Sequence, residues 1–419
     1  MIENKILKKA EAIPLDWDVK SLGNIAEIIM GQSPSSSSYN DEGVGKLLIQ
    51  GNADIDNRKT SPRTWTSEIT KQCNVGDIIM TVRAPVGAIA KSLHDACIGR
   101  GVCAIRSEDV NMEFLYQFLI NYESSWKSLE QGSTFTAVNG RDIRGIKVNL
   151  PAKSEQKKIA EILSTVDEKI EVIEEKIAKT QELKKGLMQQ LLTRGIGHTE
   201  FKDSPLGTIP FDWEVKELNE VSDITRLAGY EYSEYWKEDP DGKIMTLRGF
   251  NIGKNKLILK DIVRISEELS QKLIRSRLFK GDVVFPCVGT IGNAVVIEED
   301  DKFHINQNIA KISPHQTLNS YYLSQYLTSD LCRNEINRFN ATTSQPNVLV
   351  GSLRKFRIPV PKSIEEQKLI AGIFTEVDEK IGILEQKKNA YSELKMGLMQ
   401  QLLTGKIRVT NRLLKEAIA

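Results

Sequence analysis

Few residues in this chain have the types and spacing that catalysis requires. Its five cysteines include no Cys-x-x-Cys pair, and its four histidines lack the i, i+4 spacing of zinc ligands on a helix. No phosphate loop of the form GxxxxGKS/T, no GxGxxG, and neither an NPPY-type nor an FxGxG segment is present. Pro240 and Asp241 begin like a metal-dependent nuclease core, but the next acidic-x-Lys segment after Lys243, at 300–302, is remote. We therefore interpret Asp241 as part of a surface turn and expect a binding protein.

Side chains that could make specific hydrogen bonds fall in loops. The segment 31–40, GQSPSSSSYN, follows a strand-like run, so Gln32 and Ser33 could contact base edges and the following serines could contact phosphates. The alternative is a solvated, flexible loop. In the second half of the chain, the corresponding segment 227–236 has tyrosines and a tryptophan in place of the serines, and these could instead pack the loop down.

Basic and amide residues recur at matching places in the two halves. Arg83 and Arg100 lie in or after strand-like runs, and Gln307 and Asn308 occupy the region that matches Arg100. Arginine pairs naturally with guanine, and glutamine or asparagine with adenine. Segments 132–147 and 340–357 could form phosphate clamps, and residues 272–280 form a basic run on an expected helix. Any one of these charges could also be an ordinary solvated residue. The candidate nucleic-acid contacts are Gln32, Ser33, Ser35, Arg83, Arg100, Thr134, Arg141, Arg144, Tyr230, Arg248, Lys272, Arg275, Arg277, Gln307, Asn308, Thr343, Gln345 and Arg354.

The bulk composition limits how these residues could act. The net charge is only +1, so a nucleic-acid surface must be a local patch. Hydrophobic content of 40% is ordinary for a globular protein, and no apolar run approaches the length of a membrane helix. The N-terminal residues lack the pattern of a signal peptide, and the cysteines suit a reducing compartment. We therefore expect a cytoplasmic protein that does not bind a membrane.

The elements that position these loops are duplicated. VDEKI occurs at 166 and 377 and GLMQQLLT at 186 and 397, 211 residues apart in both cases. Segment 13–22 matches 209–218, and 76–87 matches 281–292, so the whole chain is two copies of one unit. The offset drifts within the preceding globular part and is constant in the helical part. The predicted domains are 1–150, a helix over 151–195, 196–361, a second helix over 362–405, and a tail over 406–419 that packs near the N-terminal domain.

Each globular domain is predicted to be mixed α/β. Runs such as GDIIMTVR and GDVVFPCV indicate strands entered from turns, whereas 114–122 and 321–330 are apolar at helical spacing. Each domain closes with a strand that ends at proline, at Pro151 and at Pro359 and Pro361. The fold class is therefore a pseudo-two-fold α/β (α+β) duplicate in which two long helices separate the two domains.

Both long helices carry an apolar stripe at alternating steps of four and three, the seam of a coiled coil. A helix from Glu155 to Leu192 would be about 57 Å long, or roughly 17 base pairs of DNA. We expect the two helices to pack antiparallel, with Thr180, Lys184, Lys388 and Lys395 fixing register or orientation. Alternatively, each helix packs only on its own domain. The predicted seam comprises Ile159, Leu163, Val166, Ile170, Ile173, Ile177, Leu187, Leu191, Ile370, Phe374, Val377, Ile381, Leu384, Tyr391, Leu398 and Leu402.

The combined pattern resembles the specificity subunit of type I restriction–modification systems. The resemblance rests on the two unlike α/β modules, the IPxDW openings, and the duplicated EQKKIAEILSTVDEKI, EEQKLIAGIFTEVDEKI and GLMQQLLT segments, and it covers essentially the whole chain. It implies that each module is a target recognition domain for one half of a bipartite, asymmetric double-stranded DNA site. It also implies that the helices set the gap and dock two adenine-N6 methyltransferase subunits, which restriction and motor subunits then join.

The resemblance further implies that this chain is not an enzyme and carries no cofactor. S-adenosylmethionine, ATP and magnesium would belong to the partner subunits. Two other interpretations remain at this point: a coiled-coil scaffold that binds only protein, and an enzyme with an unrecognised active site. The recognised bases do not follow from the sequence.

Overall fold

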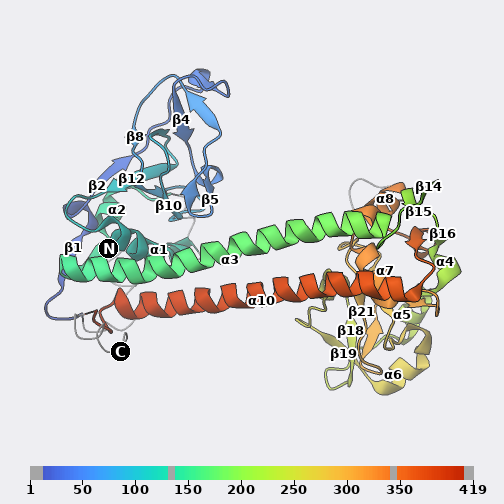
Figure 1. Ribbon diagram of the computed structural model, residues 1–419. Coiled ribbons are helices and arrows are strands. Elements are labelled where there is room, and N and C mark those ends of the chain that lie inside the picture. The colour runs from blue at the N-terminus through green and yellow to red at the C-terminus, as the bar shows by residue number, and fades with distance from the viewer. Residues whose placement is uncertain (1–12, 131–136, 340–346, 410–419) are drawn as a thin grey trace, which may run out of the picture. The chain divides into compact units, whose positions relative to one another are not determined.

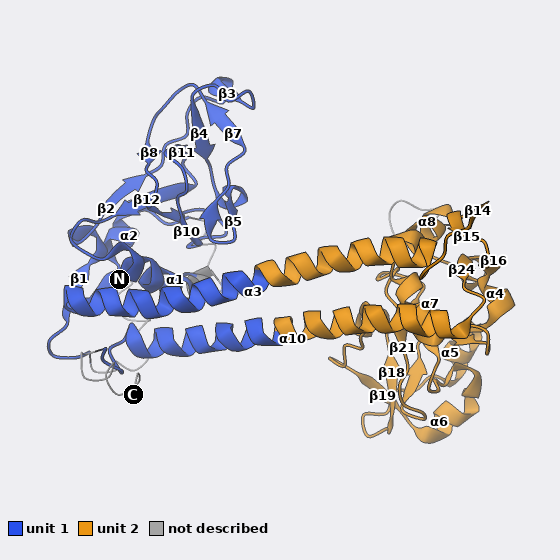
Figure 2. Ribbon diagram, in the orientation of Figure 1, with its two compact units in different colours: residues 1–174, 386–419 blue, residues 175–385 orange. Residues whose placement is uncertain are grey.

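The chain forms two compact units, each containing one α/β module (Figure 2). The computed structural model describes residues 13–130, 137–339 and 347–409. Unit 1 comprises residues 1–174 and 386–419, and unit 2 comprises residues 175–385. The division falls within both long helices, α3 (Lys153–Arg194) and α10 (Ile364–Leu402), which are labelled in Figure 1. Each unit therefore contains part of each helix, as the colours of Figure 2 show. The predicted duplicate of mixed α/β modules with two long helices is confirmed.

The module of unit 1 is built on two larger sheets and one strand pair. The six-stranded sheet has the order β2 (Glu27–Met30), β12 (Val102–Arg106), β9 (Ile78–Thr81), β10 (Ile89–Lys91), β6 (Lys59–Thr60), β5 (Ile55–Asp56). The five-stranded sheet has the order β3 (Tyr39–Asn40), β7 (Thr64–Thr66), β4 (Lys46–Ile49), β11 (Ala96–Ile98), β8 (Gln72–Cys73). Strands β1 (Asp18–Ser21) and β13 (Lys147–Leu150) pair antiparallel. Helices α1 (Met112–Glu130) and α2 (Gly140–Gly145) precede β13.

The module of unit 2 repeats this plan with shorter sheets. Its four-stranded sheet has the order β17 (Ser222–Arg226), β23 (Ile309–Pro314), β20 (Val283–Pro286), β21 (Val295–Val296). Its three-stranded sheet has the order β19 (Val263–Ile265), β18 (Ile244–Leu247), β22 (Phe303–Ile305). Two strand pairs complete it: β14 (Phe201–Ser204) with β15 (Gly207–Pro210), and β16 (Glu214–Glu217) with β24 (Arg357–Val360). Its helices are α4 (Leu218–Val221), α5 (Gly229–Tyr235), α6 (Glu267–Lys272), α7 (Ser320–Leu327), α8 (Asp330–Phe339) and α9 (Val350–Leu353).

Equivalent pairings show that the modules share one frame. The order β17-β23-β20-β21 repeats β2-β12-β9-β10, and the parallel pair β18–β22 repeats the parallel pair β4–β11. The predicted helix at 114–122 lies within α1. The one predicted over 321–330 is divided into α7 and α8. The division follows from Ser329, whose hydroxyl donates to the Tyr326 carbonyl and accepts from the Cys332 amide.

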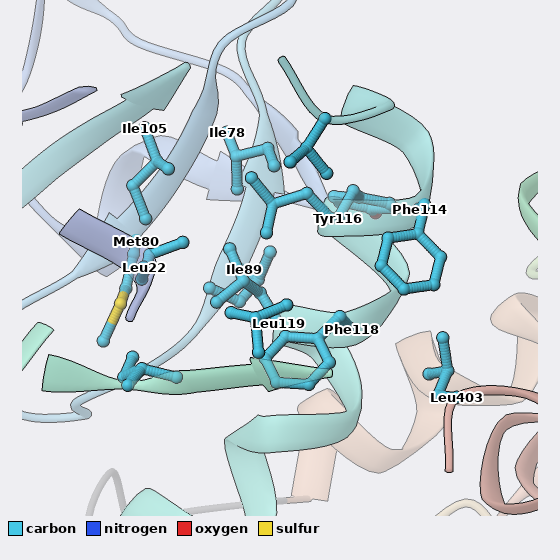
Figure 3. Close-up of a cluster of buried hydrophobic side chains, with 14 of the residues drawn as sticks. Leu22, Ile78, Met80, Ile89, Ile105, Phe114, Tyr116, Phe118, Leu119 and Leu403 are labelled. Atoms are coloured by element: carbon cyan, nitrogen blue, oxygen red, sulfur yellow. The ribbon is translucent and has the colours of Figure 1, made fainter. Parts of the chain in front are cut away.

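The core of unit 1 forms where α1 covers the six-stranded sheet (Figure 3). Phe114 and Leu119 of α1 pack with Ile78 and Met80 of β9, and all four side chains are at most 1% exposed. Burying each such side chain stabilises the fold by about 1.5–3 kcal/mol. Leu403, at the end of α10, lies in the same cluster, so the helix is anchored in the module.

The ends of the seam and its middle have different partners. Ile159 and Leu163 of α3 lie in the core of unit 1, and Ile370 and Phe374 of α10 lie in the core of unit 2. The opposite ends pack on the other module: Leu187 and Leu191 of α3 pack in the core of unit 2, and Leu398 and Leu402 of α10 pack in the core of unit 1. The alternative that each helix packs only on its own module is therefore wrong. Between the ends, Ile173 is 8% exposed and the remaining predicted positions, Val166, Ile170, Ile177, Val377, Ile381, Leu384 and Tyr391, are buried or half-buried.

Polar residues link the two helices within unit 2. The Nζ atom of Lys184 lies 2.7 Å from both carboxylate oxygens of Asp378, and the Gln325 amide of α7 donates to the same carboxylate at 3.1 Å. The lysine side chain is 13% exposed and the aspartate side chain 31%. One carboxylate thus joins α3, α10 and the module.

Unit 1 contains the equivalent link. Lys395 Nζ lies 2.6 Å from Asp167 Oδ1, and Gln117 of α1 donates to Asp167 at 2.7 Å. A second pair, Lys388 with Glu174 at 2.7 Å, lies farther along. Residue numbers rise along α3 as they fall along α10, so the helices run antiparallel within the unit. The aspartates come from VDEKI and the lysines stand two residues before GLMQQLLT, so the two copies of the repeat pair with each other.

A glutamate in the first turn, buried in α3 and half-buried in α10, fixes the start of each long helix. Glu155, in the first turn of α3, accepts from the Trp17 indole at 3.3 Å and from Arg408 at 2.9 Å. Glu366, in the first turn of α10, accepts from the Trp213 indole at 3.2 Å and lies 2.8 Å from His198. Burial alone would raise the pKa of Glu155, but the hydrogen bonds from Arg408, Val409 and Trp17, together with the charge of Arg408, outweigh it and the pKa is lowered.

The described part of the C-terminal tail lies against the module of unit 1. The Arg408 guanidinium contacts both Asp16 carboxylate oxygens, at 2.7 and 2.6 Å, as well as Glu155. These carboxylates raise the pKa of Arg408, with the hydrogen bond to Asp16 the largest contribution. The guanidinium therefore connects the tail, the segment before β1 and the first turn of α3.

Candidate nucleic-acid interface

In unit 1, loops from both larger sheets meet at one set of strand ends. The backbone N–H of Gln32 donates to the Ile98 carbonyl at 2.9 Å, and the backbone N–H of Arg100 donates to the Ser33 hydroxyl at 3.1 Å. The Gly99 amide donates to the Ile49 carbonyl at 2.8 Å, so the residues after β4 join the same group. We call these loop residues, 31–33, 50–51, 82–84, 99–101 and 137–141, the strand-end cluster of unit 1.

The backbone that brings Arg83 into this cluster is equally well defined. The Val82 amide donates to the Gly101 carbonyl and the Val138 amide donates to the Val82 carbonyl, both at 2.9 Å. Arg83 also forms a β-bridge with Ala137. The predicted contacts Gln32, Ser33, Arg83, Arg100 and Arg141 are thus brought together, although the first and last are about 110 residues apart in sequence.

The exposure of these side chains suits contact with a polyanion. Gln32, Arg83, Arg100 and Arg141 are exposed, and Ser33 is half-buried beneath the loop. Within the described ranges, neither Arg83 nor Arg100 forms an ion pair. Guanidinium groups without a carboxylate partner can donate to phosphate oxygens or to the acceptor edge of guanine.

The serine-rich loop is ordered by its own hydroxyl groups. The Ser35 amide donates to Glu68 at 2.8 Å, and the Ser35 and Ser37 hydroxyls lie 2.8 Å apart. The Ser38 hydroxyl lies 2.8 Å from that of Thr66. The loop contains a short 3-10 turn, Ser36–Ser38. Ser35 itself remains exposed.

Unit 2 has an equivalent strand-end cluster, which we define as residues 248–251, 287–290, 306–308 and 347–348. The backbone N–H of Asn306 donates to the Leu247 carbonyl at 3.2 Å, and the backbone N–H of Cys287 donates to the backbone carbonyl of Asn308 at 2.8 Å. The Val348 amide donates to the Cys287 carbonyl at 2.9 Å, as Val138 does to Val82 in unit 1. The predicted contacts Arg248, Gln307 and Asn308 therefore lie in one cluster.

The same frame carries different side chains in the two units. When the β4–β11 pairing of unit 1 is aligned with the β18–β22 pairing of unit 2, Gln50 is equivalent to Arg248 and Arg100 is equivalent to Gln307. Arg83 corresponds to Val288. Sequence reasoning missed Gln50 and Thr290, because only the pairing of distant strands brings them into the clusters. The Thr290 hydroxyl donates to the Gly249 carbonyl at 2.8 Å.

The expected basic run at 272–280 does not form one patch. Lys272 ends α6, Arg275 lies in a 3-10 turn (Ile274–Ser276), and Arg277 follows that turn. The Arg277 side chain is 3% exposed and is paired with Glu267 and Asp301. Arg277 is thus a buried structural residue, because the two carboxylates compensate its charge. Lys272 stays exposed with its ammonium 3.6 Å from the Tyr235 ring centroid, and Arg275 is exposed.

Arg144 and Arg354 hold equivalent places in the two modules. Arg144 of α2 donates to the Ile28 carbonyl of β2 at 3.4 Å, and Arg354 donates to the Ile224 carbonyl of β17 at 2.9 Å. Both attach the short helix before the final strand to the sheet, so part of their donor capacity is used internally. Tyr230, in the first turn of α5, is 64% exposed. The predicted contacts Thr134, Thr343 and Gln345 lie outside the described residues.

All five thiols are buried, and burial raises the pKa of Cys73, Cys103, Cys287 and Cys332. Burial raises the pKa of Cys103 to about 12 and that of Cys287 to about 11, so both stay protonated at neutral pH. His304 is fully buried, and its ring nitrogens lie 2.9 and 3.2 Å from two carbonyl oxygens. Burial lowers its pKa. In the described ranges no group of three or more His, Cys, Asp or Glu side chains could hold a metal ion. None of the described helices is long and apolar enough to cross a membrane.

Comparison with known proteins places the whole chain in one family. The model of the type I restriction modification DNA specificity domain matches twice, at residues 14–182 and 210–391. The type I restriction enzyme MjaVIII specificity subunit of Methanocaldococcus jannaschii is 27% identical over 422 residues, which cover 95% of each chain. The type I restriction enzyme EcoBI specificity subunit of Escherichia coli is 24% identical over 368 residues, covering 84% of this chain and 77% of that subunit.

A solved structure has the same fold. The crystal structure of the type I restriction-modification system S subunit from M. genitalium superposes with a TM-score of 0.60 at 15% identity, covering 94% of this chain and 98% of that one. The two matches to the domain model span both modules and most of both long helices. The chain therefore belongs to the family of type I restriction–modification DNA specificity proteins.

Proposed function

We propose that this chain gives a type I restriction–modification complex its DNA sequence specificity, with each module binding one half of a bipartite, asymmetric site. The observation that carries this proposal is the pair of strand-end clusters. Their backbones follow the same pattern of hydrogen bonds, yet Arg83 and Arg100 in unit 1 correspond to Val288 and Gln307 in unit 2. A common frame with different donors and acceptors suits two similar modules that recognise different bases.

The chemistry of each cluster favours a particular kind of base pair. Arg100 and Arg83 present free guanidinium groups, whose bidentate partner in the major groove is guanine. Gln307 and Asn308 present amides, whose bidentate partner is adenine. We infer a guanine contact in the half-site of unit 1 and an adenine contact in that of unit 2.

The experiment that tests this function maps methylated adenines in DNA modified by the assembled complex. Arg100→Gln is expected to relax or change only one half of the mapped site, because the other module is untouched. Lys179→Gln is the matched control: its side chain is 78% exposed on α3, outside the clusters, and should leave the site unchanged. A mapped site that stays the same with Arg100→Gln and Arg83→Gln would remove the strand-end cluster from base recognition.

The long helices present two equivalent apolar surfaces. Val172 and Leu183 on α3 are 47% and 56% exposed, and Ile383 and Leu394 on α10 are 52% and 49% exposed. Each pair is separated by 11 residues, about three turns, so both members lie on the same helix face. The members of one pair stand 211 residues from those of the other. We propose that each pair docks one of two methyltransferase subunits.

Two carboxylates of α3 next to Val172, those of Glu171 and Glu174, are already engaged in ion pairs. Glu171 pairs with Lys59, and Glu174 pairs with Lys388 at 2.7 Å. The apolar pairs are therefore better targets, because a charge placed there would meet the partner directly. The partner subunits would carry the methyl donor S-adenosylmethionine, ATP and magnesium, and would perform adenine-N6 methylation and restriction in the cytoplasm.

The exposed clusters disfavour a scaffold that binds only protein. Binding to duplex DNA by the chain with its methyltransferase subunits should weaken steeply with salt, since phosphate contacts release counterions. Binding that does not depend on salt, or that is the same for all duplexes, would favour the scaffold.

A further inference from the structure

The strand-end cluster of unit 2 contains an exposed aromatic ring. Phe250 is 50% exposed and lies in a 3-10 turn (Gly249–Asn251) directly after β18. The Arg248 guanidinium lies 4.5 Å from the centroid of the ring. A phenylalanine ring in water forgoes hydrophobic stabilisation that a binding partner would supply.

The backbone under this ring is rigidly held. Asn251 is fully buried, and its side-chain amide donates to the carbonyls of Ile258 and Lys260 at 2.8 and 2.9 Å. Its side-chain oxygen accepts from the Arg248 amide at 3.0 Å. The turn is thus preorganised to present Phe250 outward, which lowers the entropy lost on binding.

The loop that carries the ring is positively charged. Residues 248–261 include Arg248, Lys254, Lys256 and Lys260 and a single carboxylate, that of Asp261, in a chain whose net charge is only +1. An apolar ring among cations is the combination by which proteins unstack a base step while holding the adjacent phosphates. In unit 1, the matching turn, Asn52–Asp54, has no large apolar side chain.

We propose that Phe250 inserts part of its ring into one base step of the half-site bound by unit 2, and that the other half-site has no such wedge. Arg248, Lys254 and Lys260 contact the flanking phosphates, whereas Lys256 is paired with Glu385 of α10 at 3.6 Å. The inference rests on the proposed function and deepens it, because it makes the deformability of one base step a determinant of specificity in one half-site only.

The test uses the complex of this chain with its methyltransferase subunits and a duplex carrying the mapped site. 2-Aminopurine is placed in turn at each position of both half-sites. The wild-type complex should raise the fluorescence at one step of the second half-site. Phe250→Ala should abolish that rise and weaken binding roughly 5- to 150-fold, the range measured for base–aromatic stacking. Phe250→Leu should retain part of both effects, because apolar aliphatic side chains also act as wedges.

A matched control and a rescue separate this role from a structural one. Phe211→Ala removes a slightly more exposed phenylalanine, 59% against 50%, from the turn after β15 and should behave as wild type. A mismatch at the deformed step should restore most of the affinity lost by Phe250→Ala, because the step is already partly unstacked. Thermal melting should show that all variants are folded.

Two results would overturn the inference. One is a Phe250→Ala complex with wild-type fluorescence and affinity. The other is a variant whose assembly with methyltransferase subunits is weakened in the absence of DNA, which would mean that protein covers the ring. Failure of the wild-type complex to bind its site in a salt-dependent manner would instead refute the proposed function.

Discussion

The link between Lys184 and Asp378 offers a quantitative test of how the repeats hold the helices together. The perturbations are Lys184→Met, Asp378→Leu and the double variant, in the full chain. Lys184 Nζ donates to both oxygens of Asp378 at 2.7 Å, and the lysine side chain is only 13% exposed. Each single variant leaves one partly buried charge without its partner, whereas the double variant removes both charges.

The magnitude follows from the burial of the pair. Exposed ion pairs contribute about 0–1 kcal/mol, and breaking a fully buried pair costs about 3–5 kcal/mol. Asp378 is 31% exposed and keeps the Gln325 hydrogen bond, so Lys184→Met should cost about 2 kcal/mol. In a unit of this size that corresponds to a fall in melting temperature of about 4–8 °C. The double variant should lie within about 1 kcal/mol of wild type, because apolar groups replace both charges.

The assay is a double-mutant cycle measured by denaturant unfolding and by calorimetry. The control cycle uses Lys179 and Glu175 on α3, whose charged atoms are 3.8 Å apart and whose side chains are 78% and 62% exposed. Its coupling should be below about 0.5 kcal/mol. A coupling between Lys184 and Asp378 as small as that of the control would refute the view that this pair links the helices.

Four further predictions follow from other features. Glu155→Gln should lower the free energy of unfolding at pH 7 by about 1–2 kcal/mol. Because the pKa of Glu155 is lowered in the folded chain, this difference from wild type should persist above the unfolded pKa of about 4.3 and disappear as the pH falls through the folded pKa. Urea unfolding at several pH values would measure it. Gly195→Ala should destabilise the chain by about 1–3 kcal/mol in the same assay, because φ of Gly195 is +62° and a Cβ atom there would lie 2.5 Å from Glu366 Oε1. Stability equal to that of wild type would contradict this close approach of Gly195 to Glu366. Inserting one helical turn of four residues, about 6 Å, after Leu183 should lengthen the preferred gap between the two half-sites by about two base pairs. Methylation maps would show this change. An unchanged gap in a folded chain would refute the view that the length of the helix sets the gap. Val172→Asp should weaken assembly with the methyltransferase in analytical ultracentrifugation while thermal stability stays near wild type, and unaltered assembly would exclude this face.

Local patterns were sufficient to predict the elements that hold the candidate site. The four-and-three spacing from Ile159 to Ile177 predicted α3, and the observed helix, Lys153–Arg194, lies within the predicted range 151–195. Such patterns succeed because helix contacts lie within a few residues of each other in sequence. The lysines that interrupt the apolar stripe indicated paired helices, and their aspartate partners confirm this within each unit.

Non-local contacts limited the prediction of the site itself. Gln50 reaches the cluster only through the parallel pairing of β4 with β11, about 50 residues farther along the chain. Arg277 resembled its basic neighbours in sequence, yet Glu267 and Asp301 enclose it from two other segments. Neither the register of distant strands nor the choice of ion-pair partner follows from one sequence, because each depends on the complete fold.

The reciprocal pairing of the repeats also constrains how this chain can evolve. Asp167 of the first copy pairs with Lys395 of the second, and Lys184 of the first pairs with Asp378 of the second. A substitution of one of these residues in either copy therefore leaves its ion-pair partner in the other copy without a partner. The paired positions of the two copies must change together or stay unchanged. The module loops lack a counterpart of this kind within the described residues, so they can drift. They could also be exchanged by recombination at the identical VDEKI and GLMQQLLT segments, which would give new specificities on an unchanged helical frame.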